Sequence, residues 1–548
     1  MGGNDVKRGL AWLAVICVLL SICLTGCGDD GTGKNFRFPL AAEPKQLDPQ
    51  AAGDTASITL LSVLFEGLTR LDANGKAVPG AADWTVSDDG RLYTFTLRES
   101  YWSTISVRGE TPWDDPVMVT ADDFVYGLQR ALLPQTGSAW AHHLYGIENA
   151  QAVHEGKKPA DALGVRAVSE SVLTVTLIKP DAHFPAVLAG TPCMPCNRDF
   201  FAYTAGRYGL EKEYILTNGP FVLTAWNHNE SLLLHKNDYY HATDNVSPAA
   251  VRFVINPENA VEALENGSLD AAPLSATEQD VAQKAGLQVV ALEDTMRGLY
   301  FNTAASPLSI TAVRQALRDA VEWEQIYAYL QEIGEPPATG YVAPDAIVAG
   351  GEPYRNSDNA LTFQTNLNRA QTALGQGLAT LSKEGGSSAF PRLTVLAAQD
   401  DKSANLARYF IQSWQKNLKI YAELELLSEA DLANRVRSGR YEVAIYTASA
   451  TGLTGAENLQ AYASGNSENH TGFSNKAVDA ALATALSGGR AQLQAAETSL
   501  WQLCPTLPLS FPYRYYGVAA NSEGITVRPF GGGIYGSPFE FLQAKKWD

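Results

Sequence analysis

The residues that most often carry catalytic or metal chemistry are few and scattered in this chain. Only eight of the 548 residues are histidines. His142 and His143 are adjacent, so they would point about 100° apart on a helix and to opposite faces of a strand, which keeps them from sharing one metal ion. The chain has no G-x-S-x-G nucleophile turn, no H-E-x-x-H zinc helix and no phosphate-binding G-x-x-x-x-G-K-[ST] loop. The sequence therefore counts against the alternative of an enzyme and predicts no cofactor and no metal site.

Cys27 ends an amino-terminal segment that has the pattern of an export signal. Two basic residues precede eleven consecutive apolar residues, 10–20, a run that is too short to span a membrane but suits a signal core. Residues 24–27, LTGC, are similar to the bacterial lipobox, in which the chain is cut before the cysteine and the thiol is joined to a diacylglyceryl group. We expect residues 1–26 to be removed and residues 27–35 to form a flexible tether to a lipid bilayer. A plain cleaved signal is the alternative.

Besides Cys27, three cysteines would remain in the mature chain: Cys193, Cys196 and Cys504. A disulfide between Cys193 and Cys196 suits an exported protein. The same spacing in a redox centre needs a strand before it and a helix start after it, and Pro192 and Pro195 crowd this segment. A bridge from Cys504 to either partner stays open as the competing pairing.

Composition and charge bound the class of protein. The chain has 45% apolar and 18% charged residues, which is typical of globular proteins, and its length predicts two or three domains. The formal net charge is −18, and no basic stripe occurs. Nucleic acid is therefore excluded as a partner.

Alternating strands and helices organise the chain. Residues 91–98 predict a strand with Tyr93, Phe95 and Leu97 on one face, and residues 171–177 predict another. Between them, Thr120 and Asp123 form the pattern of a capped helix start, and Pro134 ends that helix.

The clearest unit lies between residues 391 and 448. It predicts a strand at 393–398, a helix with the stripe Leu406, Phe410 and Trp414, a strand with Ile420, Ala422, Leu424 and Leu426 on one face, a helix from Ser428 to Gly439, and a strand at 441–448. Strands joined by helices in this way form a parallel sheet with right-handed crossovers. Ligands of such sheets bind outside the carboxyl ends of the strands. We therefore expect a site at the loops 398–403 and 448–455.

Several motifs, in order along the chain, resemble one protein family. They are EPKQLDP (43–49), LFEGL (64–68), GKAVPGAADWTVSDDGRLYTFTLR (75–98), TADDFVYG (120–127), EGKKPADALGVRAV (155–168), TNGPFVL (217–223), LYFNT (299–303) and VRQAL (313–317). The chain resembles the bacterial extracellular solute-binding proteins of family 5, the substrate-binding lipoproteins of oligopeptide and dipeptide ABC transporters.

This resemblance implies an α/β, type II periplasmic-binding-protein fold with two lobes, a hinge and an inserted extra domain. The expected parts are lobe I (36–65, 196–300 and 507–548), domain II (66–195) and lobe III (301–506). The family's ligands are extended peptides held between the lobes through main-chain hydrogen bonds, and closure presents a shape that permease subunits recognise. It also implies a monomer anchored by Cys27 on the outer face of the cell membrane, in the periplasm if a second membrane exists.

One departure from the family's pattern concerns the ligand's free ammonium group. Relatives often carry Gly-Trp and then an aspartate after the strand that corresponds to residues 441–448. Here Thr447 and Ala448 replace Gly-Trp, and no carboxylate occurs between Glu442 and Glu457. Either another acid compensates or the ligand has no free amino terminus. The candidates for compensation are Asp54, Asp400 and Asp401.

The resemblance also places Trp140 where an aromatic side chain lines the cleft. The remaining candidates for ligand binding are Tyr446, Thr447, Ser449, Thr451 and Tyr513. Three alternatives keep the fold and change the role: a nickel chelate as the ligand, a saccharide or another small solute as the ligand, or a receptor that senses a peptide without importing it.

Overall fold

The computed structural model describes residues 35–547 except 73–75, 104–112, 182–183, 349–350, 384–389, 451, 467 and 531–532. The expected signal segment, the lipidation site Cys27, most of the tether and the candidate Thr451 lie outside the described residues. Within the described ranges, no helix has the length and apolar character that crossing a membrane requires.

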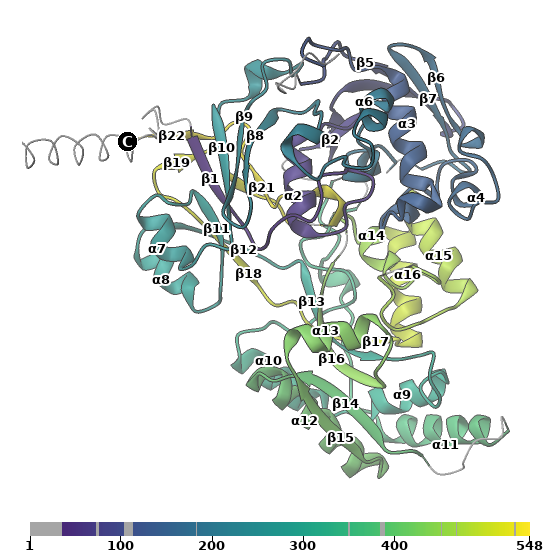
Figure 1. Cartoon of the computed structure of the whole chain (residues 1–548). Helices are drawn as coiled ribbons and strands as arrows, with labels where there is room; N and C mark the ends of the chain where they lie inside the picture. The colour runs from purple at the N-terminus through teal and green to yellow at the C-terminus, as the bar shows by residue number, and fades with distance from the viewer. Residues whose placement is uncertain are drawn as a thin grey trace, which may run out of the picture.

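Two sheets form most of lobe I, at the upper left of Figure 1. Phe36, Phe38 and Leu40 alternate with less buried residues along the first strand, which explains its half-buried pattern. The first sheet has the order β1 (Asn35–Leu40), β10 (Ala250–Ile255), β9 (Ser231–Lys236) and β8 (Phe221–Asn227), with β1 and β10 parallel. The second has the order β11 (Ala271–Leu274), β18 (Arg514–Val518) and β12 (Gln288–Leu292), beside α7 (Ala260–Glu265) and α8 (Glu278–Lys284). The helix α2 (Thr55–Leu64) contacts β8 of the first sheet instead.

The carboxyl-terminal residues return to lobe I in two short ribbons. These pair β19 (Ser522–Glu523) with β22 (Lys545–Lys546), and β20 (Thr526–Val527) with β21 (Phe539–Glu540). The ring of Phe38 on β1 stacks on Phe541 with 4.4 Å between centroids. The chain end is therefore part of the packing of lobe I.

Domain II is built on the antiparallel sheet β4 (Ala82–Val86), β5 (Leu92–Leu97), β7 (Val172–Thr176) and β6 (Val165–Ser169). The strands predicted around Phe95 and Leu173 are confirmed, and both side chains are fully buried. The predicted helix is α3 (Ala121–Leu132), and Thr120 and Asp123 form its capping box. The other elements of this part are β2 (Thr69–Leu71), β3 (Ala77–Pro79), α4 (Ala150–His154) and α5 (Phe184–Val187), and α6 (Arg198–Tyr203) follows it along the chain.

A five-stranded sheet forms the centre of the lower part of Figure 1. Its order is β15 (Ala422–Leu427), β14 (Leu393–Ala398), β16 (Val443–Ser449), β13 (Thr295–Phe301) and β17 (Thr506–Ser510). The helices around it are α9 (Thr311–Asp319), α10 (Trp323–Glu332), α11 (Leu367–Lys383), α12 (Asp401–Leu418), α13 (Glu429–Arg437), α14 (Gly455–Gln460), α15 (Lys476–Ser487) and α16 (Arg490–Leu503).

The predicted strand–helix unit is confirmed, because β14 runs parallel to both β15 and β16. Leu406, Phe410 and Trp414 of α12 are fully buried, as their spacing predicted. One part of the prediction is wrong: Leu426 is 42% exposed rather than buried. Its strand is the edge of the sheet, so it has a neighbour on one side only. The sheet is also mixed, since β13 and β17 join it in the antiparallel direction.

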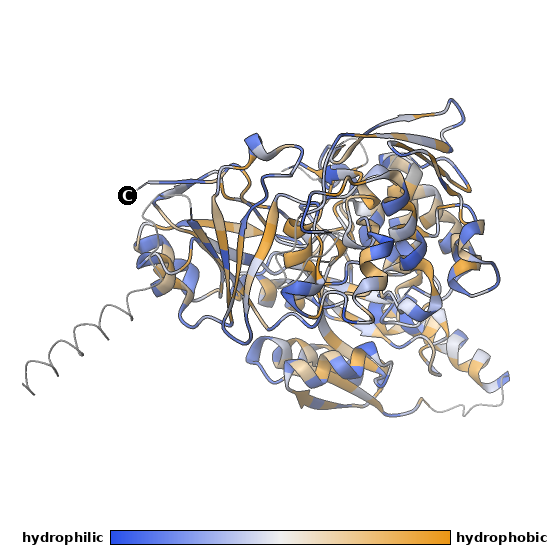
Figure 2. Ribbon diagram, turned by 45° about the horizontal axis from the view of Figure 1, so that its top comes forward, coloured by the Kyte–Doolittle hydropathy of each residue, from blue (hydrophilic) through white to orange (hydrophobic). Residues whose placement is uncertain are grey.

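Both faces of this sheet are covered at β14, which explains the nearly continuous apolar sequence of that strand. Along β13, Leu299 and Phe301 pack into one core, whereas Tyr300 packs into the other. In lobe I, Figure 2 shows strands that are largely hydrophobic, whereas the helices α7 and α8 are largely hydrophilic.

Two short segments connect the sheet of β11, β18 and β12 to the five-stranded sheet. The chain passes from β12 to β13 through Glu293 and Asp294, and returns from β17 to β18 through residues 511–513. The expected lobe boundaries after residues 300 and 506 fall inside β13 and β17, so the strand bounds put the crossings at 293–294 and 511–513 instead.

Candidate functional site

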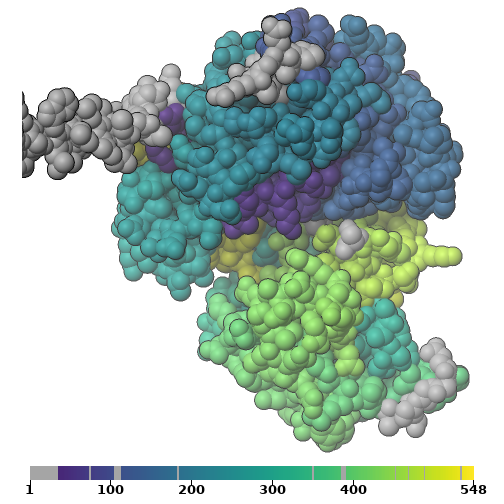
Figure 3. Space-filling model, viewed as in Figure 1, coloured from purple at the N-terminus to yellow at the C-terminus, as the bar shows by residue number. Residues whose placement is uncertain are grey.

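A cavity of about 560 Å³ opens in the wall of lobe I. It reaches the crossing segments at Arg514 and is bordered by the start of α2, by β18 and by residues 536–539. Figure 3 shows the surface hollowed between the purple residues that contain α2 and the green residues near 400–450. A volume of this size is typical of a ligand site.

Asp54 lines this cavity, and its carboxylate caps α2. It accepts hydrogen bonds from the Ser57 N–H at 2.9 Å and the Ser57 hydroxyl at 2.7 Å. Trp140 contacts the residues just before Asp54, because its Nε1 donates a hydrogen bond to the carbonyl oxygen of Ala52 at 3.2 Å. Of these two predicted residues, Asp54 lines the cavity, and Trp140 contacts the backbone of the segment that leads to Asp54.

Strand β16 carries Tyr446, Thr447 and Ser449 toward the same cleft. It pairs with β13 along its whole length but with β14 only at Val443 and Ala444. The edge of residues 446–449 that faces away from β13 therefore has no strand partner in the described part of the chain. An edge of this kind offers main-chain N–H and C=O groups to an extended ligand.

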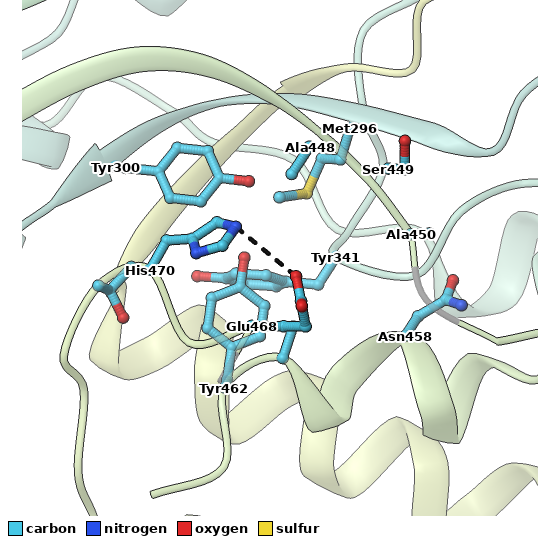
Figure 4. A pocket seen from close by; sticks show the side chains of 12 residues that line it. Met296, Tyr300, Tyr341, Ala448, Ser449, Ala450, Asn458, Tyr462, Glu468 and His470 are labelled. Atoms are coloured by element: carbon cyan, nitrogen blue, oxygen red, sulfur yellow. Dashed lines mark ion pairs between the residues drawn. The ribbon is translucent and has the colours of Figure 1, made fainter. Parts of the chain in front are cut away.

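A small pocket of about 40 Å³ adjoins the end of β16 (Figure 4). Ser449 is the one predicted residue among its walls, while Tyr446 packs behind it, with its ring 5.7 Å from Tyr300 and 5.8 Å from His470. The lining residues are Met296, Tyr300, Tyr341, Ala448, Ser449, Ala450, Asn458, Ala461, Tyr462, Glu468, His470 and Thr471.

Burial controls the charges in this pocket. It raises the pKa of Glu468, although Arg437 acts in the opposite direction. Burial, with a smaller contribution from Arg437, lowers the pKa of His470 to about 4. His470 is therefore neutral at pH 7, and its Nε2 lies 3.9 Å from Oε2 of Glu468.

Asp400 and Asp401 lie at the end of β14 and are exposed. Asp400 caps α12 by accepting the Ser403 N–H at 2.9 Å. Neither acid lines the small pocket. Tyr513 lies in the second crossing segment and is 37% exposed. The predicted residues thus gather at the cleft walls and the hinge, rather than in one pocket.

Two acidic residues, Glu293 and Asp294, form the first crossing segment, and a third, Asp345, contacts it. The Glu293 N–H donates to Oδ2 of Asp345 at 2.6 Å, and the side chain of Tyr513 hydrogen-bonds to that of Glu293. Burial raises the pKa of both carboxyls, and the charge of Asp345 raises that of Glu293 further. Asp294 pairs with Arg514 and accepts the Phe530 N–H at 2.7 Å.

Sequence reasoning missed most of the small pocket. Its residues come from β13, the loop before residue 345 and the segment 458–471, which the fold brings together. Tyr300 stands in the LYFNT motif, the one available signal. Glu468 and His470 lie in a polar loop with no recognisable pattern.

The three cysteines are buried, free thiols, so neither of the two pairings that the sequence left open, Cys193 with Cys196 or Cys504 with either of them, is formed. The Sγ of Cys196 accepts a hydrogen bond from Nη1 of Arg130 at 3.4 Å. Burial raises the pKa of Cys196 to about 12, which disfavours the reactive thiolate. Among the described residues, no three histidine, cysteine or acidic side chains gather into a metal site.

Two lobes joined by two crossings, with an inserted domain and a site at the hinge, define the type II periplasmic-binding fold. Residues 77–470 match the model of the bacterial extracellular solute-binding proteins, family 5. The chain belongs to this family and is a solute-binding protein, not an enzyme.

Individual relatives agree with this assignment. The chain is 28% identical to the oligopeptide-binding protein OppA of Bacillus subtilis, over 79% of this chain and 80% of that one. It is 30% identical to the periplasmic murein peptide-binding protein MppA of Escherichia coli, over 86% of each chain. A structure of Listeria monocytogenes OppA bound to peptide has the same fold, with a TM-score of 0.71, 21% identity, and coverage of 94% of this chain and 99% of that one.

Proposed function

We propose that this protein captures extracellular peptides, most suitably oligopeptides, and delivers them to the permease subunits of an ABC importer. In this proposal it acts as a monomer that an acylated Cys27 holds on the outer face of the cell membrane. The peptide-binding relatives support the ligand class. The observation that supports the proposal is the edge of β16 at residues 446–449, which has no strand partner in the described part of the chain and continues into the small pocket at Ala448 and Ser449.

A free strand edge favours ligands that share a repeating polar backbone. An extended peptide can pair its main chain with the edge, while its variable side chains lie in water or in the lobe I cavity. The cavity and the edge together leave room for ligands of several residues. Closure about the segments 293–294 and 511–513 would then bury the peptide between the lobes.

Calorimetry with modified peptides tests main-chain recognition. Tri-alanine, tri-serine and two tri-alanines, each methylated at one of the two amide nitrogens, are titrated into the purified protein. We expect similar affinities for the first two and at least tenfold weaker binding of one methylated peptide, because successive N–H groups of an extended chain point to opposite sides and only one of them faces the edge. Unchanged affinity for both methylated peptides would contradict edge pairing.

Mass spectrometry of material that copurifies with the protein tests the ligand class directly. A mixture of peptides supports the proposal. A single non-peptide compound, such as a nickel chelate or a saccharide, would replace it with one of the alternatives that share the fold.

A further inference from the structure

The small pocket at the end of β16 is lined by the carboxylate of Glu468, whose side chain is 36% exposed. The side chain of Glu468 accepts no hydrogen bond from the described residues, and its nearest basic group, Nε2 of His470, is 3.9 Å away. Because burial keeps His470 neutral at pH 7, this contact is not an ion pair there. Arg437 influences both groups but forms no ion pair with Glu468 in the described structure.

A second polar group points into the same space. Only 4% of the surface of Tyr300 is exposed, and this residue lines the pocket. Figure 4 shows the carboxylate of Glu468 and the hydroxyls of Tyr300 and Tyr462 directed toward one hollow. A tyrosine hydroxyl can accept a hydrogen bond from a ligand N–H group.

The shape and chemistry of the pocket fit an ammonium group. An alkyl ammonium offers a positive charge to Glu468 and three N–H donors to the acceptors around it. The pocket is lined by three tyrosine rings, from Tyr300, Tyr341 and Tyr462, and aromatic faces attract cations. Its volume of about 40 Å³ admits such a compact group but leaves no room for a whole side chain with a ring.

We propose that Glu468, with the hydroxyl of Tyr300, binds the ammonium group of the ligand. Ala448 and Ser449 belong both to the pocket wall and to the free edge of β16, so an extended ligand on that edge can place a terminal or side-chain ammonium in the pocket. Glu468 thereby compensates for the carboxylate that is missing between Glu442 and Glu457. The inference rests on the proposed peptide function and specifies the end group that the site recognises.

Calorimetry on the Glu468→Gln variant tests this assignment, and Glu429→Gln, an exposed substitution in the first turn of α13, serves as the matched control. Four probes distinguish the source of the ammonium: tri-alanine, N-acetyl-tri-alanine, Ala-Lys-Ala and Ala-norleucine-Ala. If the terminal ammonium is bound, Glu468→Gln weakens tri-alanine about ten- to a hundredfold and leaves the acetylated peptide unchanged. If the lysine ammonium is bound, the variant removes the preference for Ala-Lys-Ala over Ala-norleucine-Ala.

The inference is overturned if the wild-type protein binds the peptides and Glu468→Gln changes all four affinities equally or not at all. If no peptide binds, the proposed function fails, and the pocket is tested separately by saturation-transfer NMR with n-butylammonium and n-butanol. Transfer to the amine that disappears in Glu468→Gln would still support the ammonium site. Equal transfer in the two proteins, or to the two probes, would overturn it.

Discussion

The guanidinium of Arg514 lies against the carboxylate of Asp294, with Nε 2.5 Å from Oδ1, where the two segments that join the lobes run side by side. The side chain of Asp294 is fully buried and that of Arg514 is 29% exposed. Asp294 also accepts the N–H of Phe530, and its own carbonyl oxygen accepts the Ala450 N–H at 3.0 Å. One residue therefore ties the first crossing to the second, to the carboxyl-terminal segment and to the end of β16.

Replacing Asp294 by asparagine should destabilise the protein. The substitution removes the charge that compensates the guanidinium of Arg514, and breaking a buried pair from one side costs about 3–5 kcal/mol, with the lower end expected here because Arg514 is partly exposed. Urea unfolding would measure the change. Asp83→Asn, which breaks the exposed pair with Arg98, is the control and should have little effect. Equal stability of Asp294→Asn and the wild type would show that the pair does not hold the hinge.

The Cys27→Ala substitution should release the mature protein from the membrane. Two acyl chains are needed for stable anchoring, and the thiol of this residue is the expected point of attachment. Fractionation of cells that express the two forms would measure the distribution. Membrane retention of the variant at the wild-type level would contradict the lipid anchor, and Cys504→Ala, a buried cysteine, serves as the control.

Asp123 should make stability depend on pH. Burial raises the pKa of this carboxyl to about 6, above its ordinary value of 3.8. The folded state therefore binds the proton more tightly than the unfolded state, so stability should rise as the pH falls from about 6 toward 4 and be lower above pH 6. The contribution is about 1–3 kcal/mol.

The variant Asp123→Asn should lose this part of the pH dependence. The amide oxygen can still accept from the Thr120 N–H and Trp102 Nε1, which Asp123 now bonds at 2.9 and 3.2 Å, while no carboxylate has to be buried. Denaturation midpoints between pH 4 and 7 would measure the slopes. An unchanged slope in the variant would assign the pH dependence to other groups.

Binding of an ammonium probe should weaken in acid. The carboxylate form of Glu468 attracts a cation, and burial raises the pKa of this group, so the affinity present above that pKa is lost as the pH falls through it. Titrations of tri-alanine over a pH series would measure the decline. Glu468→Gln should show a flatter profile, and a profile equally steep in the variant would mean that a different group titrates.

The local patterns of the chain predicted the elements that depend on neighbours in sequence. Thr120 and Asp123 begin α3, and Leu406, Phe410 and Trp414 turn one side of α12 into the core, because caps and helical spacing act within a few residues. The exposure of Leu426 could not be predicted in this way. The alternation of its strand predicts one buried face, whereas the structure places this strand at the edge of the sheet.

The candidate site was likewise predicted in part from the sequence and decided in part by the fold. The end of β16 was predicted as a ligand wall from the order of strands and helices, since ligands of such sheets bind at carboxyl ends. Asp54 and Asp400 were expected as possible ammonium ligands, but both are helix caps, a role that competes with ligand binding. Glu468 was not predicted as a site residue, because it shares a pocket with tyrosines such as Tyr300 and Tyr341 that are distant in the sequence.

The sequence by itself determined the family, the export pattern, the capped helices and the parallel core of the five-stranded sheet, since these follow from motifs and from periodicity within short segments. Only the tertiary structure decided that β13 and β17 complete this sheet, that the cysteines stay apart as free thiols, and that Tyr300 and Glu468 face the same pocket. Contacts between residues more than a hundred positions apart depend on how whole elements pack, and no local pattern records that packing.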